Sequence, residues 1–296
     1  MSIDLEALYI DLHQHPELSF QETRTAGIAA GQLRDLGLEV HEGVGGTGVV
    51  GVLANGDAPT VWARADVDAL PVTEETGLPY ASKATGVDPD VNEVRVMHAC
   101  GHDMHVTAMI GAVEQLVWER DQWQGTLVVV IQPAEELGAG ARAMLDDGAL
   151  DRFPKPDIVL GQHVGPLPAG AVGLRPGPQM SASDGLHVVL HGQGGHGSRP
   201  DSTIDPVVMA AATIMRLQTI VSREEDVSWF ARDAGVPLVF WFWGGVDPAA
   251  FAAALQNGSV DHDIPTNHSP FFAPVIHPTI EVGVKALATA AREFLG

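Results

Sequence analysis

The chain has 296 residues, of which 38 are acidic and only 16 basic, so its formal net charge is −22 at pH 7. This charge repels phosphate backbones and anionic lipid surfaces, and it therefore argues against a nucleic-acid partner and against a membrane-surface role. The length allows one sizeable core with at most a small second domain.

The N-terminus has neither a basic region nor an apolar core, so we expect no signal peptide and a cytoplasmic protein. The longest strongly apolar stretch, residues 236–243, is too short to span a bilayer and is interpreted as a buried strand. The single thiol, Cys100, also suits a reducing compartment better than a disulfide framework.

Helix-type and strand-type apolar patterns alternate along the chain. In chain order we expect a helix at 23–36, strands at 49–53 and 60–65, a helix at 105–118, a strand at 126–131, a helix at 140–150, strands at 158–161 and 186–190, a helix at 206–221, the strand at 236–243 and a helix at 279–295. This alternation predicts an α/β fold in which a mixed β-sheet is flanked by helices.

Two glycine-rich segments are not nucleotide-binding motifs. Residues 43–48 match the spacing of the dinucleotide fingerprint, but a strand follows where that fingerprint requires a helix, so we interpret them as a turn into a hairpin. Residues 192–200 have no lysine placed as in a P-loop, and we expect them to form a mobile or ligand-facing loop.

A metal site is indicated by the run His-Ala-Cys-Gly-His-Asp-Met-His at residues 98–105. A thiolate two residues from an imidazole can place sulfur and nitrogen on one cation, which makes Cys100 and His102 candidate ligands. The alternative is a small buried cysteine beside an ordinary histidine. The local density of histidines favours the metal site.

Carboxylates for hydrolytic chemistry are provided by Glu135 and Glu136, which follow the predicted strand 126–131. Because adjacent side chains diverge, one carboxylate can bind metal while the other acts as general base; the alternative is a solvated acidic loop. His163 closes the next predicted strand and would lie beside Glu136 if the two strands are neighbours. His268 is distant in sequence, and its chemistry alone leaves a ligand role open.

Six ordered segments carry a resemblance to a known family. They are residues 13–22, 64–71, 97–103, 132–136, 194–200 and 267–270. Together they resemble the M20 metallopeptidase family, and within it the aminoacylase and amidohydrolase branch that includes hippurate hydrolases and auxin-conjugate hydrolases. The resemblance implies a zinc-peptidase-like catalytic domain and hydrolysis of the amide bond of N-acyl amino acids.

The resemblance also implies roles for individual residues. Two divalent ions, Zn, Mn, Co or Ni, would be held by Cys100, His102, Glu136, His163 and His268. Cys100 would bridge the two ions, and Glu135 would be the base. His196 would hydrogen-bond the reacting carbonyl group, while Arg199 is either a partner for a substrate carboxylate or an ordinary surface arginine.

Four further residues are candidates for supporting the ligands, because metal-bound imidazoles usually donate their second N–H to a carboxylate. They are Asp66, Asp68, Asp103 and His105. The alternative is simple structural polar contacts. The segment around His13, His15 and Glu22 is interpreted as structural, with Glu17 and Ser19 expected to cap the helix at 23–36.

The chain departs from its family where a lid domain is expected. The resemblance divides it into a first catalytic part at 1–184, a lid remnant at 185–224 and a second catalytic part at 225–296, so that the fold is an α/β domain with a truncated α+β lid. Loss of the lid's dimer-forming edge favours a monomer. Two hypotheses follow: an active amidohydrolase, or a catalytically impaired metal- or ligand-binding remnant. A zinc deaminase is disfavoured because its motifs are absent.

Overall fold

The computed structural model describes residues 2–177, 188–217 and 226–296. They fall into two compact units, one made of Met1–Pro176 and Asp226–Gly296 and the other of Gly177–Glu225.

The first unit is built on a mixed β-sheet with the strand order β1-β2-β6-β3-β7-β9-β8 among the described residues. The strands are β1 (Glu39–Val44), β2 (Gly48–Asn55), β3 (Thr60–Asp66), β6 (Gly125–Gln132), β7 (Ile158–Pro168), β8 (Val172–Gly173) and β9 (Leu238–Val246). β6, β3, β7 and β9 run parallel, and β1, β2 and β8 add antiparallel neighbours. A separate two-stranded hairpin joins β4 (Thr85–Val87) and β5 (Glu93–Arg95).

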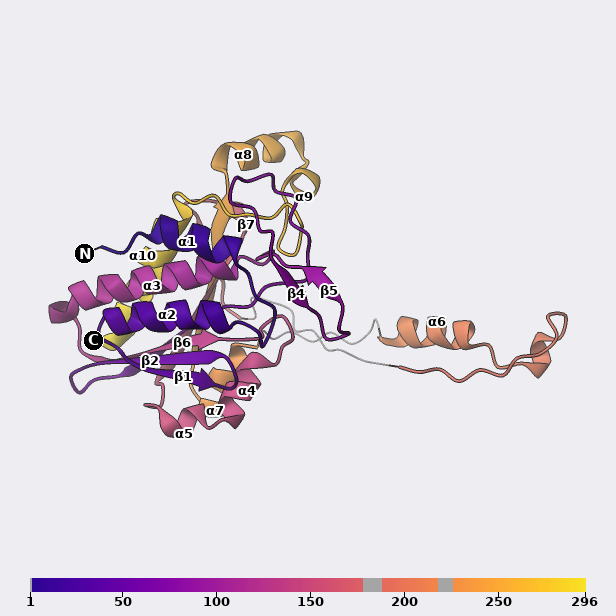
Figure 1. The fold of residues 1–296 in the computed structure, drawn as a ribbon, viewed down its shortest axis with the longest axis horizontal. Helices are drawn as coiled ribbons and strands as arrows, with labels where there is room; N and C mark the ends of the chain where they lie inside the picture. The colour runs from indigo at the N-terminus through magenta and orange to yellow at the C-terminus, as the bar shows by residue number, and fades with distance from the viewer. Residues whose placement is uncertain (1, 178–187, 218–225) are drawn as a thin grey trace. The chain divides into compact units, whose positions relative to one another are not determined.

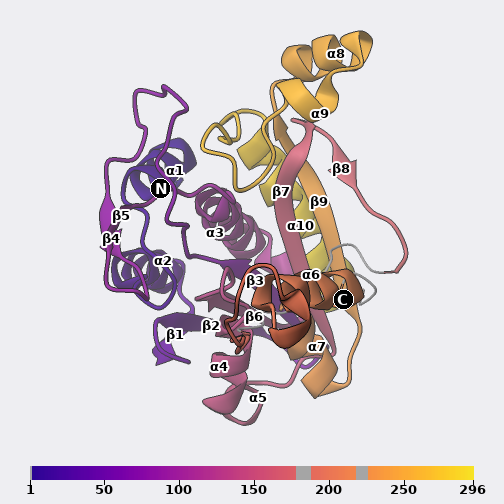
Figure 2. The same cartoon turned by 90° about the vertical axis from the view of Figure 1, so that its right-hand side faces the viewer.

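Helices cover both faces of this sheet (Figure 1). One face carries α1 (Leu5–Gln14), α2 (Thr23–Asp35), α3 (His102–Trp118) and α10 (Thr279–Leu295), and the other carries α4 (Gly140–Asp146), α5 (Ala149–Arg152) and α7 (Ser228–Ala234). A short 3₁₀ helix, Arg120–Gln122, follows α3, while α8 (Pro248–Asn257) and α9 (Val260–Asp263) follow β9. Figure 2 shows β7 and β9 side by side with α10 behind them. The predicted α/β fold with a mixed sheet is confirmed.

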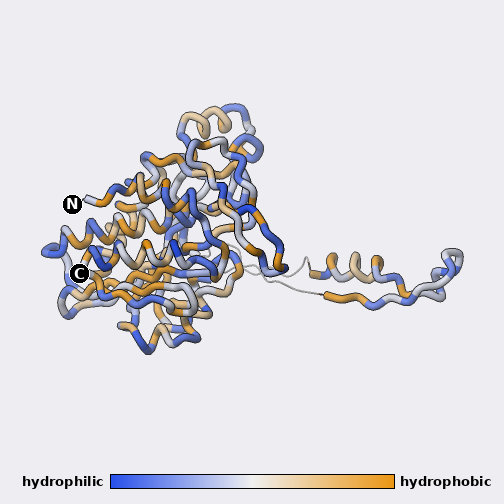
Figure 3. The backbone as a smooth tube through the Cα atoms, viewed as in Figure 1, coloured by the Kyte–Doolittle hydropathy of each residue, from blue (hydrophilic) through white to orange (hydrophobic). Residues whose placement is uncertain are grey.

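The core explains why the central strands are continuously apolar. Ala63 of β3, Met109 of α3 and Leu287 of α10 belong to one buried cluster on the first face. On the opposite face the fully buried Trp62 ring lies 5.9 Å from the Phe230 ring of α7, and its Nε1 donates to the Pro154 carbonyl at 2.7 Å. Burial on both sides favours runs of Val, Ile and Leu over alternation, and Figure 3 shows hydrophobic residues concentrated along these strands.

Most predicted elements are present, with shifted ends. The helix at 279–295 matches α10, and residues 43–48 connect β1 to β2 as the predicted hairpin turn. The helix at 105–118 begins earlier, at His102, and the helix at 140–150 divides at Gly148, whose φ of +82° ends a helical run. β7 continues to Pro168, and α1 was not predicted.

His163 was expected beside Glu136 only if β6 and β7 are neighbours, and this condition is not met, because β3 lies between the two strands and pairs in parallel with both. The strand predicted at 186–190 is wrong for residues 188–190, which do not form a strand. The rest of that prediction, residues 186–187, lies outside the described residues, as do residues 218–221 of the helix predicted at 206–221.

The strand order places a natural binding edge at β3. The chain passes from β3 through α3 to β6 on one side, and then from β6 through α4 and α5 to β7 on the other side. The strand order therefore reverses at β3, and in α/β sheets the carboxyl ends of strands at such a reversal form a binding crevice.

In the second unit, residues 188–217 contain an isolated bridge between Gln193 and Ile204, a 3₁₀ turn at Pro200–Ser202 and the helix α6 (Pro206–Leu217). The bridge brackets the glycine-rich loop predicted at 192–200. None of the helices described in either unit has the length and hydrophobicity needed to span a membrane.

Candidate metal centre

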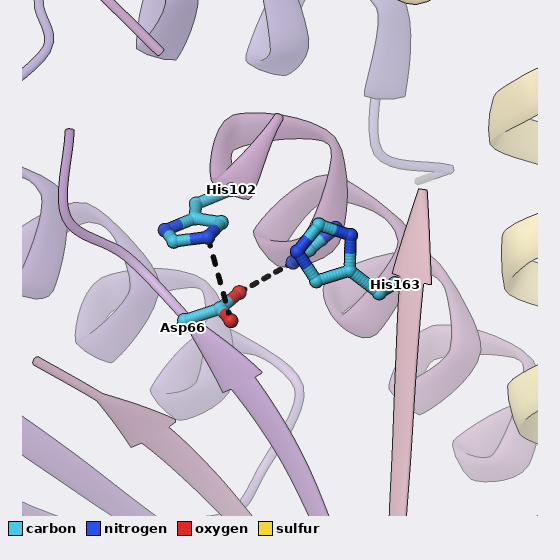
Figure 4. A group of neighbouring side chains, drawn as sticks. Asp66, His102 and His163 are labelled. Atoms are coloured by element: carbon cyan, nitrogen blue, oxygen red, sulfur yellow. Dashed lines mark hydrogen bonds and ion pairs between the residues drawn. The ribbon is translucent and has the colours of Figure 1, made fainter. Parts of the chain in front are cut away.

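The predicted metal-binding side chains gather at the carboxyl ends of β3, β6 and β7. In Figure 4 the His102 ring faces the Asp66 carboxylate, and His163 approaches from β7. One group of donor atoms that lie within 4.8 Å of one another comes from Cys100, His102 and Glu136, and a second comes from Asp66, His102, His105 and His163. His102 belongs to both groups, so the two groups of donors adjoin one another.

Cys100 and His102 are presented by a tight entry into α3. Between them Gly101 has φ +84°, and a Cβ at this position would lie 2.5 Å from Val164 Cγ1, so only glycine fits. His102 is the first residue of the helix, and its Nδ1 donates to the Asp68 carbonyl at 2.8 Å. This bond fixes the tautomer and leaves the lone pair of Nε2 available for a cation.

The hydrogen bonds of His163 and His105 leave only one of the two rings able to bind a cation. Nδ1 of His163 donates to the Val164 carbonyl at 2.7 Å, which leaves Nε2 as an acceptor 3.4 Å from Cys100 Sγ. His105 receives the Val164 amide on Nε2 at 3.0 Å and donates from Nδ1 to Asp66. Both nitrogens of His105 are therefore engaged, and its ring can orient Asp66 but offers no free lone pair.

The two glutamates stand on a turn directly after β6. Their backbone amides donate to the two oxygens of Asp68, each at 3.1 Å, while Ala134 before them has φ +46°. Glu135 Oε2 lies 3.8 Å from His102 Nε2, and Glu136 Oε1 lies 3.9 Å from it. Both carboxylates thus approach the unbonded nitrogen of His102.

His268 reaches this cluster from the C-terminal part of the chain. Its backbone amide donates to the Ala99 carbonyl at 2.8 Å, and Asn267 Nδ2 donates to the Cys100 carbonyl at 3.0 Å. These bonds hold a left-handed residue, with φ +72°, against the entry of α3. His268 Nε2 lies 3.3 Å from Glu136 Oε2, on the solvent side of the site.

Two buried atoms at the centre have no hydrogen-bond partner among the described residues: His102 Nε2 and Glu136 Oε1. Unpaired buried polar atoms cost free energy unless something binds them. A thiol, imidazoles and carboxylates around these atoms are the donor types that divalent transition metals take. The residues therefore fit a metal.

The protonation of the cluster supports the same conclusion. Burial raises the pKa of Cys100 to about 12 and holds the pKa of Glu135 well above its ordinary value. Burial alone would lower the pKa of His102, but the Asp66 carboxylate raises it well above the ordinary value, whereas burial keeps the pKa of His163 well below it. Without a cation the cluster retains protons that metal binding would displace.

The four predicted supporting residues lie in different surroundings. Asp68 contacts His102 and the glutamate turn, and Asp66 accepts from His105 and from Arg64, the latter at 2.6 Å. Asp103 instead points away from the centre, toward His13, with 2.6 Å between His13 Nδ1 and Asp103 Oδ2.

His196 and Arg199 belong to the second unit. Nδ1 of His196 accepts from the Ser198 amide at 3.2 Å, which leaves Nε2–H as a donor in the neutral ring. Arg199 is exposed and lies 3.5 Å from Asp201.

The N-terminal segment is more connected to the site than the sequence suggested. Glu17 accepts from the amides of Arg24 and Thr25 and caps α2 as expected, but Ser19 donates to Asp68 at 2.7 Å instead of capping the helix. Glu22 accepts from the Ala134 amide at 2.9 Å.

No role was predicted either for a buried charged group whose members, Arg64 and Asp226, act electrostatically on Glu135. Arg64 donates to Gln132 at 2.8 Å, to Asp66, and to Asp226 at 2.9 Å, and Gln132 in turn donates to Asp226 at 2.6 Å. Arg64 and Gln132 lie in two of the segments that carried the family resemblance, so the signal was present without an assigned role.

A mixed α/β sheet with thiol, imidazole and carboxylate donors at its switch point defines a metal-binding protein of the zinc-peptidase type. The chain belongs to peptidase family M20/M25/M40, which matches residues 62–295, and this confirms the resemblance seen in the sequence.

Relatives with described activities are similar to most of the chain. N-acetyl-L-cysteine deacetylase of Bacillus subtilis is 42% identical over 214 residues, covering 72% of this chain and 49% of the relative. Hippurate hydrolase of Campylobacter jejuni is 41% identical over 225 residues, covering 75% and 56%. The chain spans about half the length of the curated relatives it matches.

The fold is also that of a solved structure. A dinuclear metal binding peptidase of the M20 family from Bacillus subtilis superposes with a TM-score of 0.69 at 23% identity, covering 98% of each chain. At that identity the likeness supports the fold.

Proposed function

We propose that the protein is a metal-dependent amidohydrolase that cleaves the amide bond of N-acyl amino acids or related small amides. The observation that carries the proposal is the pair of unpaired buried atoms, His102 Nε2 and Glu136 Oε1, at the centre of the donor cluster. Family membership and the activities named for the deacetylase and hippurate hydrolase relatives support it.

In this proposal Cys100, His102, Glu136, His163 and His268 would hold two divalent ions. Cys100 would contribute to both, which is supported by its Sγ lying 3.4 Å from His163 Nε2 and within the donor group of His102 and Glu136. Bound metal ions would supply Lewis acidity, which lowers the pKa of water and polarises a carbonyl group. The thiolate favours zinc, and the imidazole and carboxylate donors also suit manganese, cobalt and nickel.

Glu135 is the general base in this proposal. Its carboxylate is partly buried beside the donor cluster, and burial raises its pKa, which brings its proton affinity closer to the neutral range where a base is effective. It accepts the proton of the attacking water and returns it to the leaving amine. The products are a carboxylic acid and an amino acid.

Substrate contacts are assigned to the second unit. We propose residues 185–224 as the remnant of a lid between catalytic parts at 1–184 and 225–296. His196 would donate from Nε2 to the substrate carbonyl, and Arg199 would pair with a substrate carboxylate, for which it must exchange its contact with Asp201. We further propose a cytoplasmic monomer without a nucleic-acid or membrane partner, on the basis of its net charge and its single thiol.

A second candidate is a catalytically impaired metal- or ligand-binding remnant. It is supported by the internal segment 185–224, in which the family resemblance finds only the beginning of a lid before the second catalytic part starts at residue 225. Interactions with remote parts of a substrate orient the scissile bond, so a shortened lid would lower kcat as well as raise KM.

The test combines elemental analysis with turnover. Metal-loaded protein should contain two divalent ions and hydrolyse members of a panel of N-acyl amino acids. Glu135→Gln should retain the metal and lose at least ~100-fold in kcat, the usual contribution of a general base, while Glu136→Gln should weaken metal retention. Metal binding without turnover would favour the remnant, and a zero stoichiometry after loading would reject the amidohydrolase and a metal-binding remnant.

A further inference from the structure

We propose that Glu22 is a positioning residue that holds the turn carrying Glu135 and Glu136, an assignment that rests on the function proposed above for these two residues. Glu22 stands at the start of α2, 112 positions away from the turn it contacts. It is fully buried, and no role was assigned to it beyond a structural one.

Two buried carboxylates bind three consecutive amides of this turn. Glu22 Oε1 accepts from the Ala134 amide at 2.9 Å, and the two oxygens of Asp68 accept from the amides of Glu135 and Glu136, each at 3.1 Å. Charge-assisted bonds of this kind are stronger than bonds between neutral groups. The backbone is thus fixed at each residue from 134 to 136.

The turn needs this support because its first residue is strained. Ala134 has φ +46°, a left-handed conformation that is unfavourable for an L-residue with a Cβ, and its side chain is fully buried. The turn packs closely against the start of α4, where only a residue without a Cβ fits, because a Cβ on Gly140 would lie 1.5 Å from the Pro133 carbonyl oxygen. Strained conformations persist only where the surroundings determine them.

The carboxylate of Glu22 is not required by its own helix. Although Glu22 is the N-cap residue of α2, its side chain makes no capping bond, and the helix amides of Arg24 and Thr25 are bound by Glu17 at 3.0 and 2.8 Å. The second oxygen of Glu22 accepts from Thr47 Oγ1 at 2.5 Å, which holds the carboxylate in place for Ala134. The side chain therefore serves the turn.

Removing this carboxylate would leave the buried Ala134 amide unpaired and allow the turn to relax. Glu136 and Glu135 directly follow the strained residue, so both side chains would move relative to His102. We therefore expect weaker metal binding through Glu136 and slower catalysis through Glu135. Partners beyond the ligands typically change metal affinity or activity by about 10–100-fold.

The experiment uses the whole chain with Glu22 changed in three ways. Glu22→Met keeps the length without an acceptor, Glu22→Asp keeps the charge but shortens the reach, and Glu22→Gln keeps an acceptor for Ala134 and a donor for the Thr47 hydroxyl group. Glu17→Met is the control, because it removes a neighbouring carboxylate that caps α2 without contacting the turn.

Three readouts are compared. Hydrogen exchange of the Ala134 amide in metal-free protein should be about tenfold faster in Glu22→Met and Glu22→Asp, because loss of the hydrogen bond to Glu22 leaves this amide without its acceptor. Titration with Co²⁺ should show affinity weaker by about 10–100-fold in these two variants. Glu22→Gln should stay close to the parent protein in both readouts, and Glu17→Met should lower stability without changing either one.

The third readout is a kinetic cycle with Glu135→Gln. If Glu22 acts through Glu135, Glu22→Met should lower kcat in the parent enzyme but add little in the Glu135→Gln background, since residues that act as a unit are not additive. Additive effects would indicate general destabilisation and overturn the assignment.

Unchanged Ala134 exchange and Co²⁺ affinity in Glu22→Met and Glu22→Asp would also overturn it, as would failure of both variants to fold while Glu22→Gln folds. The exchange measurement needs neither metal nor turnover. A protein that binds no metal, or that hydrolyses no amide, would therefore refute the proposed function separately from this inference.

Discussion

The buried histidine His13 should make stability fall as pH rises through the neutral range. Its Nδ1 lies 2.6 Å from Asp103 Oδ2 and its Nε2 lies 3.2 Å from Glu74 Oε1, and neither side chain of the His13–Asp103 pair is exposed. Both partners are carboxylates, so both ring nitrogens must donate and the ring is an imidazolium. Burial alone would lower the pKa of His13, but Asp103 and Glu74 raise it to about 10.

The sign and size of the effect follow from proton linkage. An unfolded histidine has its ordinary pKa near 6.5, while the folded ring keeps its proton to about 10. The stabilisation is therefore complete below pH 6.5 and is lost as pH rises toward 10. Between these values the folded state binds one proton more, so the free energy of unfolding falls by about 1.4 kcal/mol per pH unit, or about 2 kcal/mol from pH 7.5 to 9.0.

The assay is urea unfolding of the metal-free parent and of His13→Gln at pH values from 7.5 to 9.0. Other groups shared by the two proteins cancel in the difference between their slopes, which isolates the contribution of His13. NMR of the imidazole carbon-bound protons gives a direct check, because the ring should stay protonated throughout this range. A His13 ring that titrates near pH 6.5 in the folded protein would refute the reasoning.

Further predictions concern the metal site, the core and the assembly. Cys100→Ser combined with His102→Ala should abolish metal binding, measured as stoichiometry after loading; two retained ions would reject the site. Gly101→Ala should lower metal affinity, measured by Co²⁺ titration, because its Cβ would lie 2.5 Å from Val164 Cγ1. Trp62→Ala should lower the free energy of unfolding in urea by about 3–5 kcal/mol, as for a fully buried tryptophan. In solution, light scattering should give the mass of one chain. A stable dimer would contradict the proposal that the dimer-forming edge of the family's lid has been lost.

The sequence by itself determined the features that depend on neighbouring residues. The spacing of Cys100 and His102 on either side of a glycine sets a thiol and an imidazole at the start of one helix. The position of Glu135 and Glu136 after an apolar strand indicated a pair of carboxylates at a sheet edge. The helical pattern of residues 279–295 was sufficient for α10, because apolar periodicity reports which face of an element is buried.

The sequence could not determine which strands are neighbours. The apolar runs of β3, β6 and β7 are equally suited to a buried parallel strand, and their order depends on which face each connecting helix covers. Placing β3 between β6 and β7 puts Asp66 and Asp68 at the middle of the site, between the glutamate turn and His163.

Only the tertiary structure decided how each polar side chain is used. Asp103, adjacent to a candidate ligand in sequence, points toward His13, whereas Glu22, far from any candidate, holds the Ala134 amide. Local spacing fixes the direction of side chains within one element. Hydrogen bonds between segments about a hundred residues apart depend on packing of the whole sheet and its helices, and no local pattern encodes them.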